Sequence, residues 1–250
     1  MSSRLPGQKV WVVGGSSGIG AELARELVRR GAKVAISGRR ATQLEDIADG
    51  TMTTFPVDVT DAEAVGDAAA AVRDRLGGLD TVVFSAGYWK QFDAAVWDRE
   101  TFARHVEVNL LGLNNVLAAV VPGLVSQGGG HVVGIASVAG YRGLAGSEAY
   151  GATKAAQLNL LEAMRASLSP KGIRVTTVAP GFVRTEMTSS NEFPMPFIID
   201  ADEAGRTIAD GLERGDENIV FPRRMAVAMG LARLVPGRLW TAITTRGAKA

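Results

Sequence analysis

Hydrophobic positions along the chain alternate between short apolar runs and longer amphipathic stretches. The apolar runs predict strands near residues 9–14, 33–37, 52–57, 80–86, 131–137, 172–179 and 218–221. The amphipathic stretches predict helices near 18–30, 41–49, 61–76, 98–126, 147–169 and 200–214. Such regular alternation is typical of an α/β protein whose parallel sheet is covered on both faces. We therefore predict a doubly wound parallel sheet of about seven strands, in a single domain over residues 1–250.

Two segments do not fit this alternation. Residues 184–199 contain Pro194 and Pro196, which interrupt any helix, so we predict a mobile loop that orders over bound substrate. Residues 223–250 form an apolar tail of two short helices separated at Pro236-Gly237, with arginines at intervals. Helices of this kind cover a pocket, pack on a neighbouring subunit or lie on a membrane surface. We favour packing on protein over membrane contact, because the apolar area would otherwise be an exposed patch.

Composition excludes several classes of function. The formal net charge is +1, with Lys and Arg dispersed, so no basic face suggests a nucleic-acid partner. The chain has no Cys, which excludes disulfides, thiolate metal sites and a Cys nucleophile. His105 and His131 form no ligand cluster, so no metal is predicted. We find neither a signal peptide nor an uninterrupted apolar stretch long enough to span a bilayer, and we expect cytoplasmic residence.

A glycine-rich turn follows the first predicted strand. Glycines at 14, 18 and 20 let the backbone approach a pyrophosphate, whose charge meets the N–H groups and positive dipole at the start of a helix. The spacing is G-x-x-x-G-x-G, which differs from the G-x-G-x-x-G form. We predict a dinucleotide site formed by Gly14, Ser16, Ser17, Gly18, Ile19 and Gly20.

Tyr150 and Lys154 lie four residues apart in a predicted helix, so they project from one face about a turn apart. An ammonium near a phenol stabilises the phenolate. The pKa of a phenol is ordinarily near 10, and it must be lowered by roughly two to three units for the group to exchange protons near neutral pH. A Y-x-x-x-K pair also fits a helical Tyr above a solvated Lys, and the dinucleotide site is what favours the chemical interpretation.

The two motifs together resemble the short-chain dehydrogenase/reductase family, from about Lys9 to Pro222. Further matches are Asp58 in PVDVT, Asn109 in VEVNLLG, Ser137 in VVGIASVAG and Pro180-Gly181 in VAPGFVRTEM. The resemblance implies a Rossmann-type sheet of strand order 3-2-1-4-5-6-7. It also implies reversible hydride transfer between nicotinamide C4 and a carbonyl or alcohol carbon.

The resemblance also implies roles for individual residues. Tyr150 gives or takes the hydroxyl proton, Lys154 lowers its pKa and holds the nicotinamide ribose, Ser137 hydrogen-bonds the substrate oxygen, and Asn109 positions a proton-relay water. Asp58 hydrogen-bonds the adenine amino group. The remaining implied cofactor contacts are Val59, Ser85, Ala86, Gly87, Pro180, Gly181, Val183 and Thr185, the last two at the carboxamide.

This chain departs from the family at two places. Phe84-Ser85-Ala86-Gly87 stands where Asn-Asn-Ala-Gly is usual, and Val13 stands where Thr often opens the glycine motif. The Asn side chains brace neighbouring backbone in the family, so we expect the floor of the cofactor site to be supported differently here.

Cofactor choice is predicted from the end of the second strand, Ser37-Gly38-Arg39-Arg40. A carboxylate there would accept hydrogen bonds from an adenosine ribose and repel a 2′-phosphate, yet no acidic residue occurs between Glu26 and Glu45. We therefore favour NADP(H), with Ser37, Arg39 and Arg40 as contacts. The alternative is that both arginines cap carbonyls or begin the next helix.

Aromatic and Met side chains border the expected nicotinamide position without a clustered charge: Tyr88, Trp89, Phe92, Phe182, Met187, Phe193, Met195 and Phe197. They favour a lipophilic ketone or secondary alcohol as substrate, although several of them also fit core or oligomer contacts. Small residues at Ala149, Ala152, Ala156 and Ala163 would let their helix pack closely on another subunit, and the family resemblance implies a homodimer or homotetramer.

Two rival functions remain. An NADP(H)-binding sensor without turnover needs the glycine turn and Arg39, but has no reason to retain Ser137, Tyr150 and Lys154 together. Sugar-nucleotide epimerases and dehydratases also use a Tyr-x-x-x-Lys pair. They carry a different glycine spacing and a longer C-terminal substrate domain, so we favour the oxidoreductase.

Overall fold

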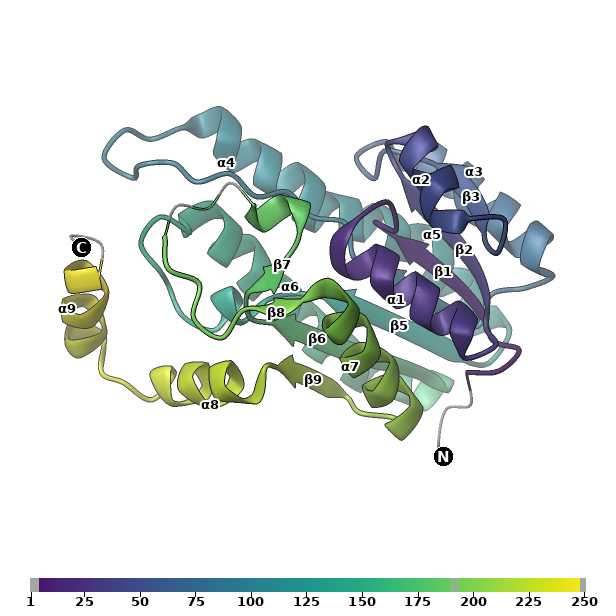
Figure 1. The fold of residues 1–250 in the computed structure, drawn as a ribbon. Coiled ribbons are helices and arrows are strands. Elements are labelled where there is room, and N and C mark those ends of the chain that lie inside the picture. The colour runs from purple at the N-terminus through teal and green to yellow at the C-terminus, as the bar shows by residue number, and fades with distance from the viewer. Residues whose placement is uncertain (1–4, 190, 192, 248–250) are drawn as a thin grey trace.

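The computed structural model describes residues 5–189, 191 and 193–247, with only the backbone of 243 and 245–247. A seven-stranded parallel sheet has the order β3-β2-β1-β4-β5-β6-β9 (Figure 1). The strands are β1 Lys9–Val13, β2 Lys33–Gly38, β3 Thr53–Pro56, β4 Thr81–Phe84, β5 Gly130–Ile135, β6 Ile173–Pro180 and β9 Asn218–Phe221. The predicted fold and strand order are thereby confirmed.

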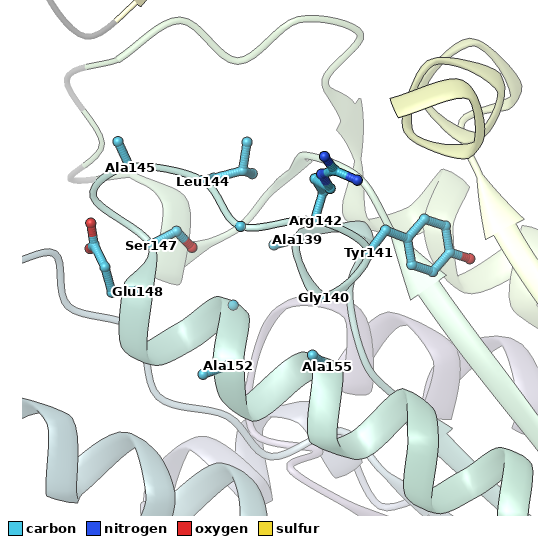
Figure 2. A pocket seen from close by; sticks show the side chains of 12 residues that line it. Ala139, Gly140, Tyr141, Arg142, Leu144, Ala145, Ser147, Glu148, Ala152 and Ala155 are labelled. Atoms are coloured by element: carbon cyan, nitrogen blue, oxygen red, sulfur yellow. The ribbon is translucent and has the colours of Figure 1, made fainter. Parts of the chain in front are cut away.

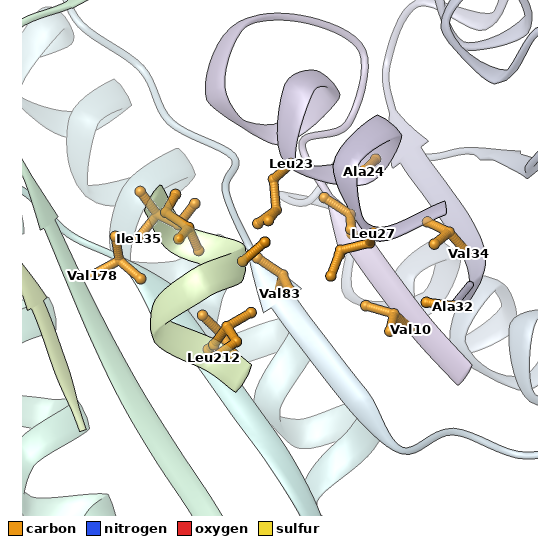
Figure 3. Close-up of a cluster of buried hydrophobic side chains, with 14 of the residues drawn as sticks. Val10, Leu23, Ala24, Leu27, Ala32, Val34, Val83, Ile135, Val178 and Leu212 are labelled. Atoms are coloured by element: carbon orange, nitrogen blue, oxygen red, sulfur yellow. The ribbon is translucent and has the colours of Figure 1, made fainter. Parts of the chain in front are cut away.

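Helices cover both faces of the sheet (Figure 1). They are α1 Gly18–Arg29, α2 Ala41–Ala48, α3 Ala62–Leu76, α4 Arg99–His105, α5 Gly112–Ser126, α6 Glu148–Leu168 and α7 Ala201–Arg214. On one face, Leu23 and Leu27 of α1 and Leu212 of α7 pack with Val10 and Val83 of the sheet (Figure 3). The alternate residues of the strands join a second core under α3, α5 and α6. Because both faces are covered, the central strands are apolar throughout rather than alternating.

The predicted helix over 98–126 is continuous from Arg99 to Ser126, but a π-helical segment, η1 Val106–Leu111, separates α4 from α5. An 18-residue window of this run has a mean hydropathy of 1.7, with 33% of it buried. By length and composition alone it could cross a membrane, as the core helices of soluble proteins also could. One side of the run packs in the second core through Val108, Leu113 and Val116. The run therefore packs on the sheet, and its outer side exposes Leu111 and Val125 together with the polar Glu107 and Asn114.

The loop over 184–199 is closed at its base by two short parallel strands, β7 Val183–Arg184 and β8 Ile199–Asp200. The one-turn 3-10 helix η4, Glu186–Thr188, follows β7. The sequence pattern did not predict either short strand, because two residues are too few to show a period.

The tail forms two helices, α8 Arg223–Ala232 and α9 Gly237–Gly247. Met225 and Met229 are buried against Val138 and Ala179. The Trp240 indole N–H donates to the Gly143 carbonyl at 2.7 Å. The tail thus packs on the segment between β5 and α6 of its own chain, and its other side exposes Val227, Leu231, Leu234 and Leu239.

Candidate active site

The glycine turn connects β1 to α1 at the carboxyl edge of the sheet. Gly14 has φ +94°, and a Cβ there would meet the Ala86 backbone nitrogen at 2.4 Å, so both conformation and space require glycine. Gly18 has φ +56° and opens α1 against the side chain of Thr185. Ser17, the N-cap of α1, makes no side-chain cap hydrogen bond. The turn is a cradle beside a helix N-terminus, which fits a pyrophosphate.

The turn is supported from below by β2. The N–H groups of Gly14 and Gly15 donate to the Ser37 carbonyl at 2.8 and 2.9 Å. The Ser37 hydroxyl is fully buried and accepts a hydrogen bond from the Trp11 indole at 2.9 Å. Ser37, which we expected to contact the cofactor directly, therefore lies under the turn and braces it. The chain lacks the two Asn side chains that are usual in the family, and here Ser37 and Trp11 support the turn.

Charged residues line the other end of the groove. The Arg40 guanidinium forms a bidentate ion pair with Glu186 of η4, at 2.7 and 2.8 Å, and donates to the Ser17 hydroxyl at 3.3 Å. Arg39 lies near Asp58, which accepts hydrogen bonds from Thr60. Burial raises the pKa of Asp58, but the Thr60 hydrogen bonds and the nearby arginine charges outweigh burial and lower its pKa overall. Asp58 is thus held as a carboxylate.

Ser137, Tyr150 and Lys154 come together at the ends of β5 and the start of α6. The Lys154 ammonium nitrogen lies 5.5 Å from the centroid of the Tyr150 ring. The Ser137 side chain lies close enough to Tyr150 to lower the pKa of its phenol, and the Ser137 hydroxyl donates to the Pro180 carbonyl at 3.4 Å. The Ser137 oxygen also accepts from the Ala139 N–H at 3.1 Å, which fixes the hydroxyl at the turn into η2 Val138–Gly140. The three predicted groups form one constellation.

Burial dominates the protonation of this pair. It raises the pKa of Tyr150 to about 12, and the Ser137 side chain lowers that pKa only in part. Burial also lowers the pKa of Lys154 to about 7. We expected Lys154 to lower the pKa of Tyr150; desolvation of the phenolate instead dominates that pKa and raises it. The phenol is therefore protonated at neutral pH, which is the form that donates a proton.

Asn109 lies behind the groove rather than in it. It is fully buried in η1, and its side-chain amide bonds the backbone N–H and carbonyl of Tyr88 at 2.7 and 3.1 Å and the Thr153 hydroxyl at 3.0 Å. The Asn109 backbone carbonyl accepts a hydrogen bond from the Gln157 amide at 2.5 Å. Asn109 therefore holds the strand-end segment that follows Gly87. A π-helical turn at this position is a feature found often at functional sites.

Gln157 is a residue of this site that our sequence analysis missed. It is 1% exposed, and its side-chain oxygen accepts a hydrogen bond from the Lys154 ammonium at 2.9 Å. A signal was present, because position 157 follows Tyr150 by seven residues and Lys154 by three and so shares their helix face. A polar side chain on the buried face of a helix is expected to have a hydrogen-bond partner inside the protein.

Aromatic side chains cover the Tyr150 end of the groove. The ring of Trp89 stands edge-on at 5.3 Å from that of Tyr150 and 6.5 Å from that of Phe193, which lies 6.0 Å from Phe182. The Trp89 indole donates to the Asn191 side chain at 2.9 Å, which joins the 184–199 loop to this wall. Phe92 instead contacts Trp97. Tyr88 packs on His105, whose ring lies beside Tyr150. Four of the expected substrate-side aromatics therefore lie in ring contacts around Tyr150: Tyr88, Trp89, Phe182 and Phe193.

Most predicted site residues line this one groove. They are Gly14, Ser16, Ser17, Gly18, Ile19, Arg39, Arg40, Asp58, Val59, Ser85, Ala86, Gly87, Ser137, Tyr150, Lys154, Pro180, Gly181, Val183 and Thr185. Gly20 lies behind the groove, since a Cβ on it would meet the Gly14 carbonyl oxygen at 2.1 Å. Met187 and Thr188 add a wall from η4 that we did not assign to the cofactor site.

A second hollow, of about 630 Å³, lies where the segment over 139–148 faces Ala152 and Ala155 of α6 (Figure 2). Arg142 borders it and donates to the carbonyl groups of Arg233 and Val235, which precede α9. Among the described residues that line it, none belongs to the Ser137, Tyr150 and Lys154 constellation. It is a separate hollow, bordered by the residue that anchors the tail.

The fold and the groove define a Rossmann-type protein with a dinucleotide cradle at one end and a Ser-Tyr-Lys constellation at the other. The chain belongs to the short-chain dehydrogenase family, whose profile matches residues 8–194. It is 39% identical over 241 residues to a protein of Myxococcus xanthus described as an uncharacterized oxidoreductase, covering 94% of this chain and 95% of that one.

Solved structures agree with this assignment. A short-chain dehydrogenase from Burkholderia cenocepacia in complex with NADP matches with a TM-score of 0.82 and 29% identity, over 94% of this chain and 100% of the other. A variant of actinorhodin polyketide ketoreductase with NADPH matches with a TM-score of 0.77 and 25% identity, over 88% and 97% of the two chains. The protein is thus an oxidoreductase of a family that binds a nicotinamide cofactor.

Proposed function

We propose that the protein transfers a hydride between NADP(H) and the carbonyl or secondary alcohol carbon of a lipophilic small molecule. One observation carries this proposal: Ser137, Tyr150 and Lys154 line the same groove as the glycine turn. Proton-transfer groups and a dinucleotide cradle therefore meet at one place. A binding protein without turnover gains nothing from a buried Lys154, whose charge is costly to desolvate.

Each residue has a defined part in the reaction. When bound, the cofactor supplies or accepts the hydride at nicotinamide C4. The Tyr150 phenol donates its proton to the carbonyl oxygen during reduction and takes it back during oxidation. Ser137 donates a hydrogen bond to that oxygen as negative charge develops. The Lys154 ammonium stabilises the phenolate left behind and holds the nicotinamide ribose, while Thr185 and the Val183 backbone hold the carboxamide.

The preference for NADP(H) is supported by two guanidinium groups at the end of β2, a segment that carries no acidic residue of its own between Glu26 and Glu45. The Glu186 carboxylate that pairs with Arg40 comes from η4. We expect NADPH to bind at least about tenfold more tightly than NADH, a difference of about 1.4 kcal/mol. Fluorescence titration of both cofactors measures this directly. Arg39→Asp should reverse the order, whereas Arg206→Asp on the exposed side of α7 should not change it. Equal affinities in the wild type would refute the phosphate role of Arg39.

The substrate class is supported by the aromatic wall beside Tyr150, since Trp89, Phe182 and Phe193 present apolar faces there. We expect aryl and long-chain ketones to be reduced faster, at equal concentration, than sugars or keto acids of similar size. A panel of these compounds, followed by NADPH absorbance, tests the proposal. Trp89→Ala should reduce the difference between apolar and polar ketones, while reduction of charged keto acids at rates comparable to those of apolar ketones would contradict the class.

A homodimer or homotetramer is supported by the outer sides of the continuous helix over 99–126 and of α6. Leu111, the last residue of η1, is 49% exposed, and Val125 of α5 is 39% exposed. On α6, Ala152 and Ala163 are exposed, but Ala149 is buried within the chain, so it does not contribute to a subunit contact as we had expected. Light scattering at micromolar concentration should give a dimer or tetramer, and a monomer would contradict this proposal.

A further inference from the structure

We propose that Gln157 is a positioning residue for the Tyr150–Lys154 pair: its amide fixes the direction and the charge of the Lys154 ammonium. This inference rests on the proposed function, because it assigns a task within the same site. The observation behind it is a chain of hydrogen bonds from the Lys154 ammonium to the Gln157 side-chain oxygen, and from the Gln157 amide nitrogen to the Asn109 carbonyl.

The Lys154 ammonium has three donors, and two of them have fixed partners. One N–H donates to the Ile135 carbonyl and another to the Gln157 oxygen, both at 2.9 Å. These two acceptors belong to different elements, β5 and α6, so they determine where the third donor points. That donor is left for the side of the groove that holds Tyr150. A single acceptor would leave the ammonium free to rotate about the Nζ–Cε bond.

The orientation of the Gln157 amide is determined by its partners. With the oxygen toward Lys154, the NH₂ group faces the Asn109 carbonyl, and both contacts are favourable. The reversed amide would place NH₂ against the ammonium and one oxygen against another. Since both ends are buried, the reversed amide would leave a polar group without a favourable partner at each end. Gln157 therefore presents an acceptor to Lys154 permanently.

The described titratable groups around Tyr150 and Lys154 offer no charged partner for the ammonium, so the Gln157 oxygen matters for its charge. Lys154 and Tyr150, both on α6, face each other. The other titratable side chain that faces them in the described part of the chain is His105 on α4, whose ring lies 6.4 Å from the Tyr150 ring. His105 bonds the Thr101 carbonyl through Nδ1 and accepts from the Lys90 N–H through Nε2, and burial lowers its pKa, so it is neutral. Among the described residues, no carboxylate forms an ion pair with Lys154. The Gln157 oxygen is therefore the side-chain acceptor that opposes the loss of the Lys154 proton on burial.

Two substitutions with opposite electrostatic effects test this role. Gln157→Leu removes the acceptor, so Lys154 should lose its proton at lower pH, by about one unit. Gln157→Glu retains an acceptor and adds negative charge, so the proton should be lost at higher pH. Gln127→Leu is the matched control: the Gln127 amide, like that of Gln157, donates to backbone carbonyl groups, but its described hydrogen bonds involve no titratable side chain.

Two measurements report the shift. The first is the alkaline limb of kcat for ketone reduction, which should move down by about one pH unit in Gln157→Leu and up in Gln157→Glu. In Gln157→Leu, kcat should fall about tenfold or more while the substrate KM stays within about threefold. The second is the pH dependence of unfolding of the cofactor-free protein, which should shift in the same two directions. This second measurement needs no substrate, so it tests Gln157 even where the proposed reaction fails.

Opposite shifts in the two Gln157 variants, with none in Gln127→Leu, are the expected result. Shifts in the same direction, or lost activity without any shift, would show that Gln157 is a packing residue and overturn the proposal. Should Gln157→Leu not fold, the sign of the shift in Gln157→Glu decides the question.

Discussion

Lys154 should make the stability of the cofactor-free protein depend on pH in a way that one substitution removes. The residue is 3% exposed, and burial lowers its pKa from 10.5 to about 7. The unfolded chain therefore keeps the Lys154 proton between about pH 7 and pH 10.5, whereas the folded protein has released it. Since the unfolded state binds more protons in this window, the free energy of unfolding must rise with pH.

The size of this effect follows from the two pKa values. A group that binds one more proton in the unfolded state changes stability by about 1.4 kcal/mol per pH unit. Allowing for partial protonation near pH 7, the rise between pH 7 and 9 should be about 2 kcal/mol. Tyr150 contributes little below pH 10, because its pKa is raised in the folded protein. Buried His105 and His131 have lowered pKa values and titrate below this window.

The test is urea unfolding of the wild type and of Lys154→Met at pH 7, 8 and 9, without cofactor and at one protein concentration. Met fills a similar volume but cannot hold a proton. The substitution also removes the two hydrogen bonds of the Lys154 ammonium at every pH. The change of unfolding free energy with pH is therefore compared between the two proteins, rather than their absolute stabilities. Lys171→Met is the control, since that side chain is exposed. If the wild type and Lys154→Met changed in parallel with pH, Lys154 would retain its charge throughout, and the argument from burial would be wrong.

Four further outcomes are expected. Tyr150→Phe should keep less than about a tenth of wild-type turnover at every pH while NADPH affinity by fluorescence stays nearly unchanged, because ring packing survives without the proton donor. His131, whose pKa burial lowers to about 3, is protonated on unfolding below about pH 6.5; the wild type should therefore lose about 3 kcal/mol more than His131→Gln between pH 6.5 and 4 in acid unfolding. Glu186→Gln should release Arg40 and raise NADPH affinity several-fold without changing that for NADH. Deleting residues 224–250 should lower solubility or change oligomer size or substrate range while NADPH still binds, and salt-sensitive co-sedimentation with anionic liposomes, lost on deletion, would instead favour a membrane role for the tail.

The fold was predictable because each central strand is buried on both faces, so hydrophobic runs mark it without ambiguity. Helix α6, predicted over 147–169, is observed at Glu148–Leu168, and the seventh strand of the sheet begins and ends where expected. The π-helical segment in the first long helix was not predictable, since its extra residue per turn is set by packing around Asn109 and leaves no period of its own.

The site was predictable where two motifs support each other, as the glycine turn at Gly14 supports the chemical interpretation of Tyr150 and Lys154. It was not predictable where a residue's partner lies on another element. Ser37 shares the end of β2 with the arginines, yet its side chain turns under the sheet edge toward Trp11. Gln157 needed its two partners to be known before its polarity on a buried helix face had a meaning. Hydrogen bonds between distant segments are decided by the fold, and periodicity carries no record of them.

The 184–199 loop connects the two halves of the groove physically. Near its start, Glu186 holds Arg40 at the adenosine end, and further along Asn191 and Phe193 contact Trp89 beside Tyr150. If the cofactor is NADP(H), its 2′-phosphate would compete with Glu186 for Arg40, so we expect cofactor binding and the position of this loop to depend on one another. Because linkage is reciprocal, a substrate that holds the loop closed against Trp89 must alter the affinity for NADPH by the same factor that NADPH alters the affinity for substrate. Affinity for NADPH should therefore differ with and without a bound, non-reacting ketone or alcohol analogue, and that difference should disappear in Glu186→Gln if the ion pair is the connection.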